Sequence, residues 1–180
     1  MPVLFYTFNM KNDPTSTMLD EKADYYGSQV RAFGKQYPSF HWPSVEILLN
    51  LIYTYDVVSA RMDRYLSRYG LSRAAFNVLM IVRRSEGSGC KQRDISKLLL
   101  VSRANVTGLV DGLVRQGLAA RTAHAHDRRA HIIKLLPKGQ KMLDSVLPEY
   151  YSYVQKLSAG LSSAKKKEMN DLLLCLRREV

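Results

Sequence analysis

Residues 89–141 decide the fold of this chain and read GCKQRDISKLLLVSRANVTGLVDGLVRQGLAARTAHAHDRRAHIIKLLPKGQK. Apolar residues recur at helical spacing in the first part of this stretch and at strand spacing in the later part. We therefore expect two helices and two strands: helices over 92–99 and 102–117, and strands over 119–122 and 131–135. An arginine-containing tip joins the strands, and Ser102 is suited to cap the second helix. A capped helix followed by a basic hairpin is an arrangement that can hold duplex DNA.

The same stretch carries most of the positive charge of the chain. It contains eleven lysines and arginines and three acidic residues, so it accounts for +8 of the formal net charge of +11. Clustered positive charge indicates a polyanionic partner, either a nucleic acid or an anionic membrane surface. No apolar run reaches the roughly 18 residues that a membrane-spanning helix needs. We therefore expect double-stranded DNA as the partner and no membrane association.

Two cysteines, Cys90 and Cys175, lie far apart in the sequence and outside any CxxC pattern. This usage is typical of a reducing cytoplasm and predicts neither a disulfide framework nor a zinc cluster. Each is expected to be a small buried residue, while a redox-sensing thiol at Cys90 stays open as an alternative. The start, MPVLFYTFNM, lacks the cationic region and apolar stretch of a signal peptide. The expected location is the cytoplasm, in association with the nucleoid.

Amphipathic helices are predicted on both sides of this stretch. Apolar residues recur at three- and four-residue steps in four segments: 19–36, 44–69, 140–158 and 164–178. Gly70 is expected to end the second of these helices, and Ser72 to cap the helix that follows. The four segments carry more apolar surface than a small domain can cover alone, which predicts an obligate homodimer. A monomer folded back on itself is the alternative.

Helix 102–117 is expected to have one face in the core and one face open to DNA. The inward face holds apolar residues at helical spacing: Val106, Leu109, Val110 and Leu113. The outward face and the start of the helix carry small and polar residues: Arg103, Ala104, Asn105, Thr107, Gly108, Asp111 and Arg115. Small residues let a backbone approach a nucleic acid closely, and Arg, Asn and Thr read base edges or bind phosphate oxygens.

Three residues of this helix have more than one interpretation. Gly108 and Gly112 each cost about 1 kcal/mol in helix propensity relative to alanine. Close approach to DNA would explain them, and so would tight packing against a neighbouring helix. An unpaired Asp111 facing DNA would be repelled, so we expect it to pair with Arg115 one turn later or with an arginine of the tip.

The tip, residues 123–130, combines one acid with two arginines. Asp127 can close the turn by accepting backbone N–H bonds, and it can orient one arginine through a forked pair. The second member of the pair Arg128 and Arg129 can then enter a narrow minor groove. A solvated charged hairpin is the alternative.

No catalytic residue and no metal site are expected. Three histidines lie in or beside the tip (His124, His126 and His131), but Asp127 is the one further ligand nearby. The motifs GxSxG, HExxH, GxxxxGK[ST] and GxGxxG do not occur. We therefore expect neither an enzyme nor a cofactor.

The blocks VSRANVTGLVDGLVRQGL (101–118) and DRRAHIIKLLPKG (127–139) resemble the MarR family of winged helix-turn-helix transcription regulators. The resemblance extends over residues 43–145. It implies a dimer whose recognition helices, here 102–117, enter successive major grooves while the wings, here around 123–130, reach adjacent minor grooves. Where the family often has arginine, this chain has Gly112, so a phosphate contact or a wing anchor is missing.

The resulting fold class is mainly α with a small β-hairpin wing. A winged helix-turn-helix domain is expected between N- and C-terminal dimerisation helices. The expected boundaries are 1–42 for an N-terminal extension and helix, 43–71 and 137–180 for dimerisation helices, and 72–136 for the DNA-binding domain.

The expected function is a sequence-specific transcription regulator, a repressor that binds a pseudo-palindromic operator as a homodimer. The residues expected at DNA are Ser102, Arg103, Asn105, Thr107, Gly108, Arg115, Arg128 and Arg129, with Asp127 as the anchor of the wing turn. A non-specific architectural DNA-binding protein is the alternative.

The resemblance further implies, for many members, a small aromatic or anionic effector that loosens DNA. Aromatic walls with one or two arginines would suit such a ligand. The residues expected to bind it lie on or beside the long helix: Trp42, Tyr53, Arg61 and Tyr65. The alternative is that these tyrosines are simply half-buried at the dimer seam.

Overall fold

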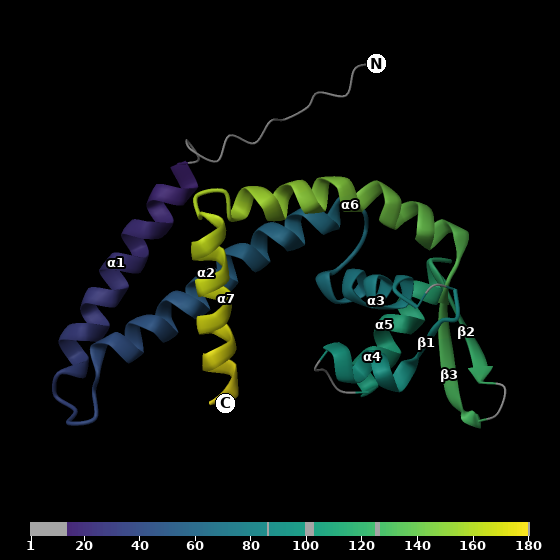
Figure 1. The fold of residues 1–180 in the computed structure, drawn as a ribbon, viewed down its shortest axis with the longest axis horizontal. Coiled ribbons are helices and arrows are strands. Elements are labelled where there is room, and N and C mark those ends of the chain that lie inside the picture. The colour runs from purple at the N-terminus through teal and green to yellow at the C-terminus, as the bar shows by residue number, and fades with distance from the viewer. Residues whose placement is uncertain (1–13, 86, 100–102, 125–126, 180) are drawn as a thin grey trace, which may run out of the picture. The chain divides into compact units, whose positions relative to one another are not determined.

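The computed structural model describes residues 14–85, 87–99, 103–124 and 127–179. Within these ranges the chain is mainly helical and carries one small antiparallel sheet (Figure 1). The helices are α1 (Pro14–Gly34), α2 (Trp42–Ser67), α3 (Arg73–Arg83), α4 (Gln92–Leu99), α5 (Arg103–Arg115), α6 (Pro137–Leu157) and α7 (Ser163–Arg178). The strands are β1 (Cys90–Lys91), β2 (Ala119–His124) and β3 (Asp127–Leu135). The expected fold class is confirmed.

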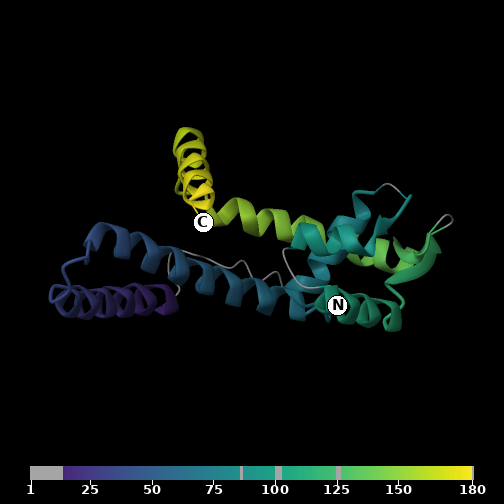
Figure 2. The ribbon, with the colours of Figure 1, turned by 90° about the horizontal axis from the view of Figure 1, so that it is seen from below.

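The chain divides into two compact units at residues 62 and 63. In the first unit, α1 and the larger part of α2 form a helical hairpin (Figures 1 and 2). Two backbone hydrogen bonds order its turn: Tyr37 N–H donates to the Gly34 carbonyl at 2.9 Å, and Phe40 N–H donates to the Tyr37 carbonyl at 3.0 Å. Gly34 is buried against the Phe40 ring, where a larger side chain would collide.

In the second unit, the core begins at the end of α2 and at α3. Gly70 follows α2 with φ +67°, and the Ala75 N–H donates to the Ser72 hydroxyl at 3.1 Å. Both residues therefore end and cap helices as the sequence predicts. The largest fully buried side chains come from every layer of this unit: Leu66, Leu79, Ile95, Leu113, Leu118, Ile133 and Leu143.

The sheet has the strand order β1-β3-β2, and both pairings are antiparallel. Cys90 pairs with Ile133 and Ala119 with Leu135, so β3 is the central strand. The hairpin strands are longer than expected from 119–122 and 131–135, because pairing continues to His124 opposite Asp127. The two-residue β1 was not expected, since two residues show no periodicity.

The short helix α4 buries only part of its apolar surface within the chain. Ile95 is fully buried and Leu99 is half-buried, but the Leu98 side chain is 65% exposed. A helix of eight residues has a narrow buried stripe, and the residue three positions after Ile95 falls outside it.

The connection from α5 to β2 also holds the start of α6. The Leu118 N–H donates to the Leu113 carbonyl at 2.9 Å, and the Leu118 carbonyl accepts from Leu136 N–H at 3.1 Å. Gly139, in the first turn of α6, lies directly against the Leu118 backbone carbonyl. The Lys138 ammonium donates to the Gln116 carbonyl at 2.8 Å. Backbone and side-chain contacts therefore join the end of α5 to the start of α6.

The final helix, α7, is capped by Ser162, whose hydroxyl accepts from Lys165 N–H at 3.3 Å. None of its residues is buried within the chain, and Leu172 is 60% exposed. Several other large apolar side chains of α6 and α7 are also open: Tyr151, Val154, Leu157, Met169, Leu174 and Leu176. None of the described helices has the length and apolar character that a membrane crossing requires.

Candidate nucleic-acid interface and ligand pocket

Helix α5 presents two chemically different faces. Val106, Val110 and Leu113 are fully buried, and Leu109 is half-buried. The opposite face is open at Ala104, Asn105, Thr107, Gly108 and Arg115. The inward and outward faces expected from the sequence are therefore confirmed in the monomer.

The glycines of α5 are not packed against another part of the described chain. A Cβ atom added at Gly108 or at Gly112 would have no atom from another part of the described chain within 4 Å. Tight packing against a neighbouring helix of the same chain, one of the two interpretations of these glycines, is therefore wrong. Because their space is open, the outer face of α5 is smooth enough for another molecule to approach its backbone.

Thr107 connects α5 to the helix that precedes it. The Gln92 side-chain amide donates to the Thr107 hydroxyl at 2.8 Å. Gln92 begins α4, so this hydrogen bond fixes the start of one helix against the outer face of the next. The Thr107 hydroxyl is thus already oriented before any ligand is bound.

Asp111 pairs with an arginine that the sequence did not single out. Its carboxylate lies 2.8 Å from the Arg121 guanidinium, and Arg121 belongs to β2. The expected pairing with Arg115 is wrong, and the side chains of the tip arginines Arg128 and Arg129 lie outside the described residues. The pair instead links the recognition helix to the first strand of the hairpin, a long-range contact that local spacing does not reveal.

Replacing Asp111 by asparagine is expected to lower the free energy of unfolding by about 1–2 kcal/mol. The Arg121 Nε and Nη2 atoms are buried without a hydrogen-bond partner among the described residues, and the Arg121 side chain is 27% exposed. Loss of the carboxylate would therefore leave a poorly hydrated cation. Urea unfolding of D111N measures the change. In E149Q, which breaks the open Arg68–Glu149 pair at 3.5 Å, the change should stay below about 0.5 kcal/mol.

At the outer end of the wing, the structure describes the backbone of β2 up to His124 and of β3 from Asp127, without the side chains of residues 124–129. The strands β2 and β3 form a hairpin with a register shift between Ala123 and His124. Ser102 lies outside the described residues, as do the side chains of Arg103, Asp127, Arg128 and Arg129. The roles expected for these five residues remain predictions.

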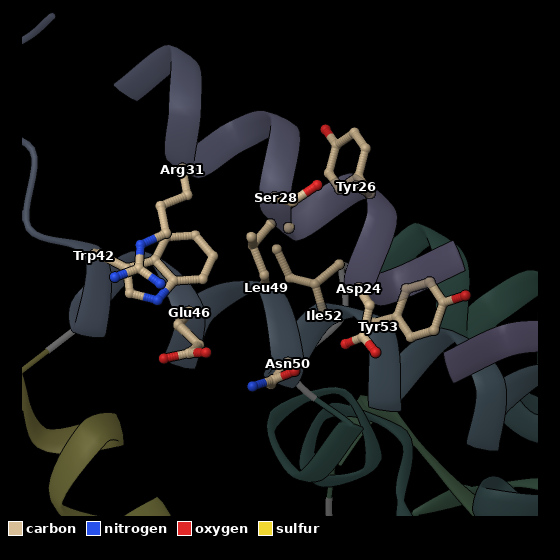
Figure 3. Close-up of a pocket in the computed structure, with 11 residues that line it drawn as sticks. Asp24, Tyr26, Ser28, Arg31, Trp42, Glu46, Leu49, Asn50, Ile52 and Tyr53 are labelled. Atoms are coloured by element: carbon tan, nitrogen blue, oxygen red, sulfur yellow. The ribbon is translucent and has the colours of Figure 1, made fainter. Parts of the chain in front are cut away.

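The expected effector residues do not form one site. A pocket of about 500 Å³ lies between α1 and α2, and Trp42 and Tyr53 line it (Figure 3). Arg61 and Tyr65 do not belong to its lining. Along a helix, Trp42 and Tyr65 are separated by roughly 35 Å, which is too far for one small ligand.

Tyr65 has a structural partner of its own. Its hydroxyl donates to the Val146 carbonyl of α6 at 2.7 Å, and the side chain is buried. Burial is the main cause that raises the pKa of Tyr65, and its neighbour Tyr69 adds to the shift. The residue therefore fastens α2 to α6 inside the second unit.

Comparison with known proteins agrees with this geometry. A model of the MarR family matches residues 69–130. The HTH-type transcriptional regulator YkoM of Bacillus subtilis (strain 168) is 30% identical over 139 residues, which cover 75% of this chain and 89% of YkoM. This chain belongs to the MarR family. It is a transcription regulator and not an enzyme, as the sequence predicts.

A further relative and a solved structure are also similar to this chain. The HTH-type transcriptional repressor YetL of Bacillus subtilis (strain 168) is 28% identical over 137 residues, covering 76% of this chain and 82% of YetL. The fold is similar to that of MepR from S. aureus, solved as a DNA complex, with a TM-score of 0.65 and 23% identity. That match covers 71% of this chain and 96% of MepR.

The described part of this MarR family protein contains no group of three or more His, Cys, Asp or Glu residues placed to hold a metal ion. His126 and the side chain of His124 lie outside the described residues.

Cys90 is half-buried in β1, and burial together with the nearby Asp94 carboxylate raises the pKa of its thiol. A raised thiol pKa lowers the thiolate fraction, so the structure does not favour the redox-sensing alternative. Cys175 is exposed and not buried as expected.

The Cys90 thiol is expected to react slowly with iodoacetamide near neutral pH. Because its pKa is raised, the thiolate forms at higher pH, so the rate should keep rising after a small free thiol has reached its plateau. The C175S variant isolates Cys90, and the same variant unfolded in urea serves as the control. A folded-state rate equal to that of the unfolded control would contradict the prediction.

Proposed function

We propose that this MarR family protein is a repressor that binds a pseudo-palindromic operator as a homodimer, with half-sites about one helical turn apart. The proposal rests on one observation: the outer face of α5 is open at small residues while its inner face is buried. The proposed DNA contacts are Ser102, Arg103, Asn105, Thr107, Gly108, Arg115, Arg128 and Arg129, with Asp127 as the anchor of the wing turn. The solved complex of MepR with DNA supports this use of the fold.

The proposed roles of the parts of the chain follow the domain boundaries expected from the sequence. Residues 72–136 bind DNA at the nucleoid in the cytoplasm, residues 43–71 and 137–180 form the dimer, and residues 1–42 add a further helix. The open apolar side chains of α6 and α7 support a homodimer, because a second copy would cover them. No residue of α7 is buried within the chain, which favours the homodimer over the monomer folded back on itself.

A small aromatic or anionic effector is proposed to loosen the complex with DNA. CouR from Rhodococcus jostii RHA1, solved with p-coumaroyl-CoA, supports ligand binding on this fold.

The affinity for operator DNA is expected to fall steeply with salt. Six or more phosphate contacts would lower the affinity by about a thousandfold or more between roughly 50 and 200 mM salt, because each contact releases counterions. A fluorescence anisotropy titration at several salt concentrations measures the slope. A flat response would contradict the proposal.

Footprinting on promoter DNA separates the repressor from the architectural alternative. Protection of one discrete site with two-fold symmetry supports the repressor. Uniform protection along the fragment supports a protein that coats or bends DNA without reading its sequence.

A further inference from the structure

Thr107 lies on the outer face of α5, the surface that is proposed to meet DNA. It is exposed, and so are Ala104, one turn earlier, and Gly108, the next residue. Threonine carries two different groups on its Cβ atom, a hydroxyl that forms hydrogen bonds and a methyl that forms apolar contacts. The direction of each group therefore decides what Thr107 can recognise.

The hydroxyl of Thr107 is turned toward the preceding helix. Gln92 begins α4, and its side-chain Nε2 atom donates to Thr107 Oγ1 at 2.8 Å. In a helix the threonine side chain divides between two rotamers, and this hydrogen bond selects the one that places Oγ1 beside α4. The methyl, which is the other substituent of the Cβ atom, points away from Gln92.

Gln92 is held in the contact between α4 and α5. Its Oε1 atom is buried and has no hydrogen-bond partner among the described residues. A glutamine that reads adenine needs both the oxygen and the nitrogen of its amide at the base edge. Because one of these atoms is buried and the other is bonded to Thr107, Gln92 is not placed to read a base itself. It acts through Thr107.

We propose that Thr107 reads thymine through its methyl group and that Gln92 is the positioning residue for this contact. In the major groove, the C5 methyl distinguishes thymine from the other three bases, and apolar side-chain atoms recognise it. Ala104 lies one turn away on the same face, so its methyl would add to the apolar contact. The inference rests on the proposed function, in which the outer face of α5 enters the major groove.

The probes are two forms of the duplex that footprinting identifies, one with thymine and one with uracil at every thymine position of the half-sites. Uracil pairs as thymine does and lacks only the methyl group. A buried methyl contributes roughly fourfold in affinity, so a dimer on two half-sites should bind the uracil duplex about fifteenfold more weakly. Fluorescence anisotropy measures both affinities, and their ratio is the methyl discrimination. Replacing one thymine at a time should locate the effect at one position in each half-site.

Two variants of Thr107 separate the methyl from the hydroxyl. T107V keeps a methyl and removes the hydroxyl, so the methyl discrimination should be retained. T107S keeps the hydroxyl and removes the methyl, so most of the discrimination should be lost. The matched control is T54S, which removes a threonine methyl from α2 and should leave the discrimination unchanged. Thermal melting verifies that each variant is folded.

Variants of Gln92 test the positioning role. Q92A should lower the discrimination to roughly fourfold, because Thr107 then divides between its two rotamers. Q92E should restore the discrimination, since its carboxylate can accept the hydroxyl proton of Thr107, while its negative charge weakens the binding of both duplexes. A change of both affinities by the same factor in Q92A would show that Gln92 is only structural, and it would contradict the positioning role.

The outcomes separate this inference from the proposed function. Equal affinity for the thymine and uracil duplexes would overturn the inference and leave the proposed function in place. Discrimination that survives in T107S would assign the methyl contact to another residue and would overturn the inference as well. Absence of binding to either duplex would overturn the proposed function, and the inference with it.

Discussion

The G108L variant is expected to lose operator binding by about a thousandfold, the lower end of the ratio between specific and non-specific affinity. Gly108 lies on the open face of α5, and a larger side chain there would hold the helix away from the floor of the major groove. The fold should remain intact, because an added Cβ has nothing within 4 Å and leucine favours helix more than glycine does. Fluorescence anisotropy with operator DNA measures the loss.

The matched control is G160L. Gly160 also has open space around it, but it lies between α6 and α7, away from α5. Operator affinity should be unchanged in this variant. Normal binding by G108L would show that the outer face of α5 does not contact DNA, and it would remove the main support for the proposed function.

The G139A variant is expected to lower the free energy of unfolding by about 3 kcal/mol. The added Cβ would collide with the Leu118 backbone carbonyl, and neither α6 nor the α5–β2 connection can shift without losing hydrogen bonds. For a chain of this size the melting temperature should fall by roughly 10 °C. Circular dichroism during heating measures both the transition and the helix content.

The control for G139A is the same substitution where the glycine is unopposed. G112A adds a Cβ in open space within α5, so it should raise the stability by up to about 1 kcal/mol through helix propensity. The two alanine variants should therefore change stability in opposite directions. If G139A melted like the unsubstituted protein, close packing of α6 on Leu118 would be wrong.

Much of the second unit could be predicted from the sequence because its signals are local. The spacing of Val106, Val110 and Leu113 defines the buried face of α5 within a few turns. Ser72 and Gly70 mark helix ends through their own backbone preferences. Such features need no knowledge of distant parts of the chain.

The errors concern contacts between residues far apart in sequence. Arg121 pairs with Asp111 across the α5–β2 connection, whereas helical spacing offered Arg115. Trp42 and Tyr65 were grouped as one ligand site because both lie on the long helix, but the pocket is closed by α1. Periodicity assigns a residue to a face, and it does not say which element covers that face.

The links around Leu118 have a mechanical consequence. The end of α5 and the first turn of α6 both contact the backbone of Leu118, and the Lys138 ammonium adds a side-chain hydrogen bond to the Gln116 carbonyl. A molecule that tilts α6 is therefore expected to move α5 as well, because both helices contact Leu118. A movement of α6 can thus reach the outer face of α5.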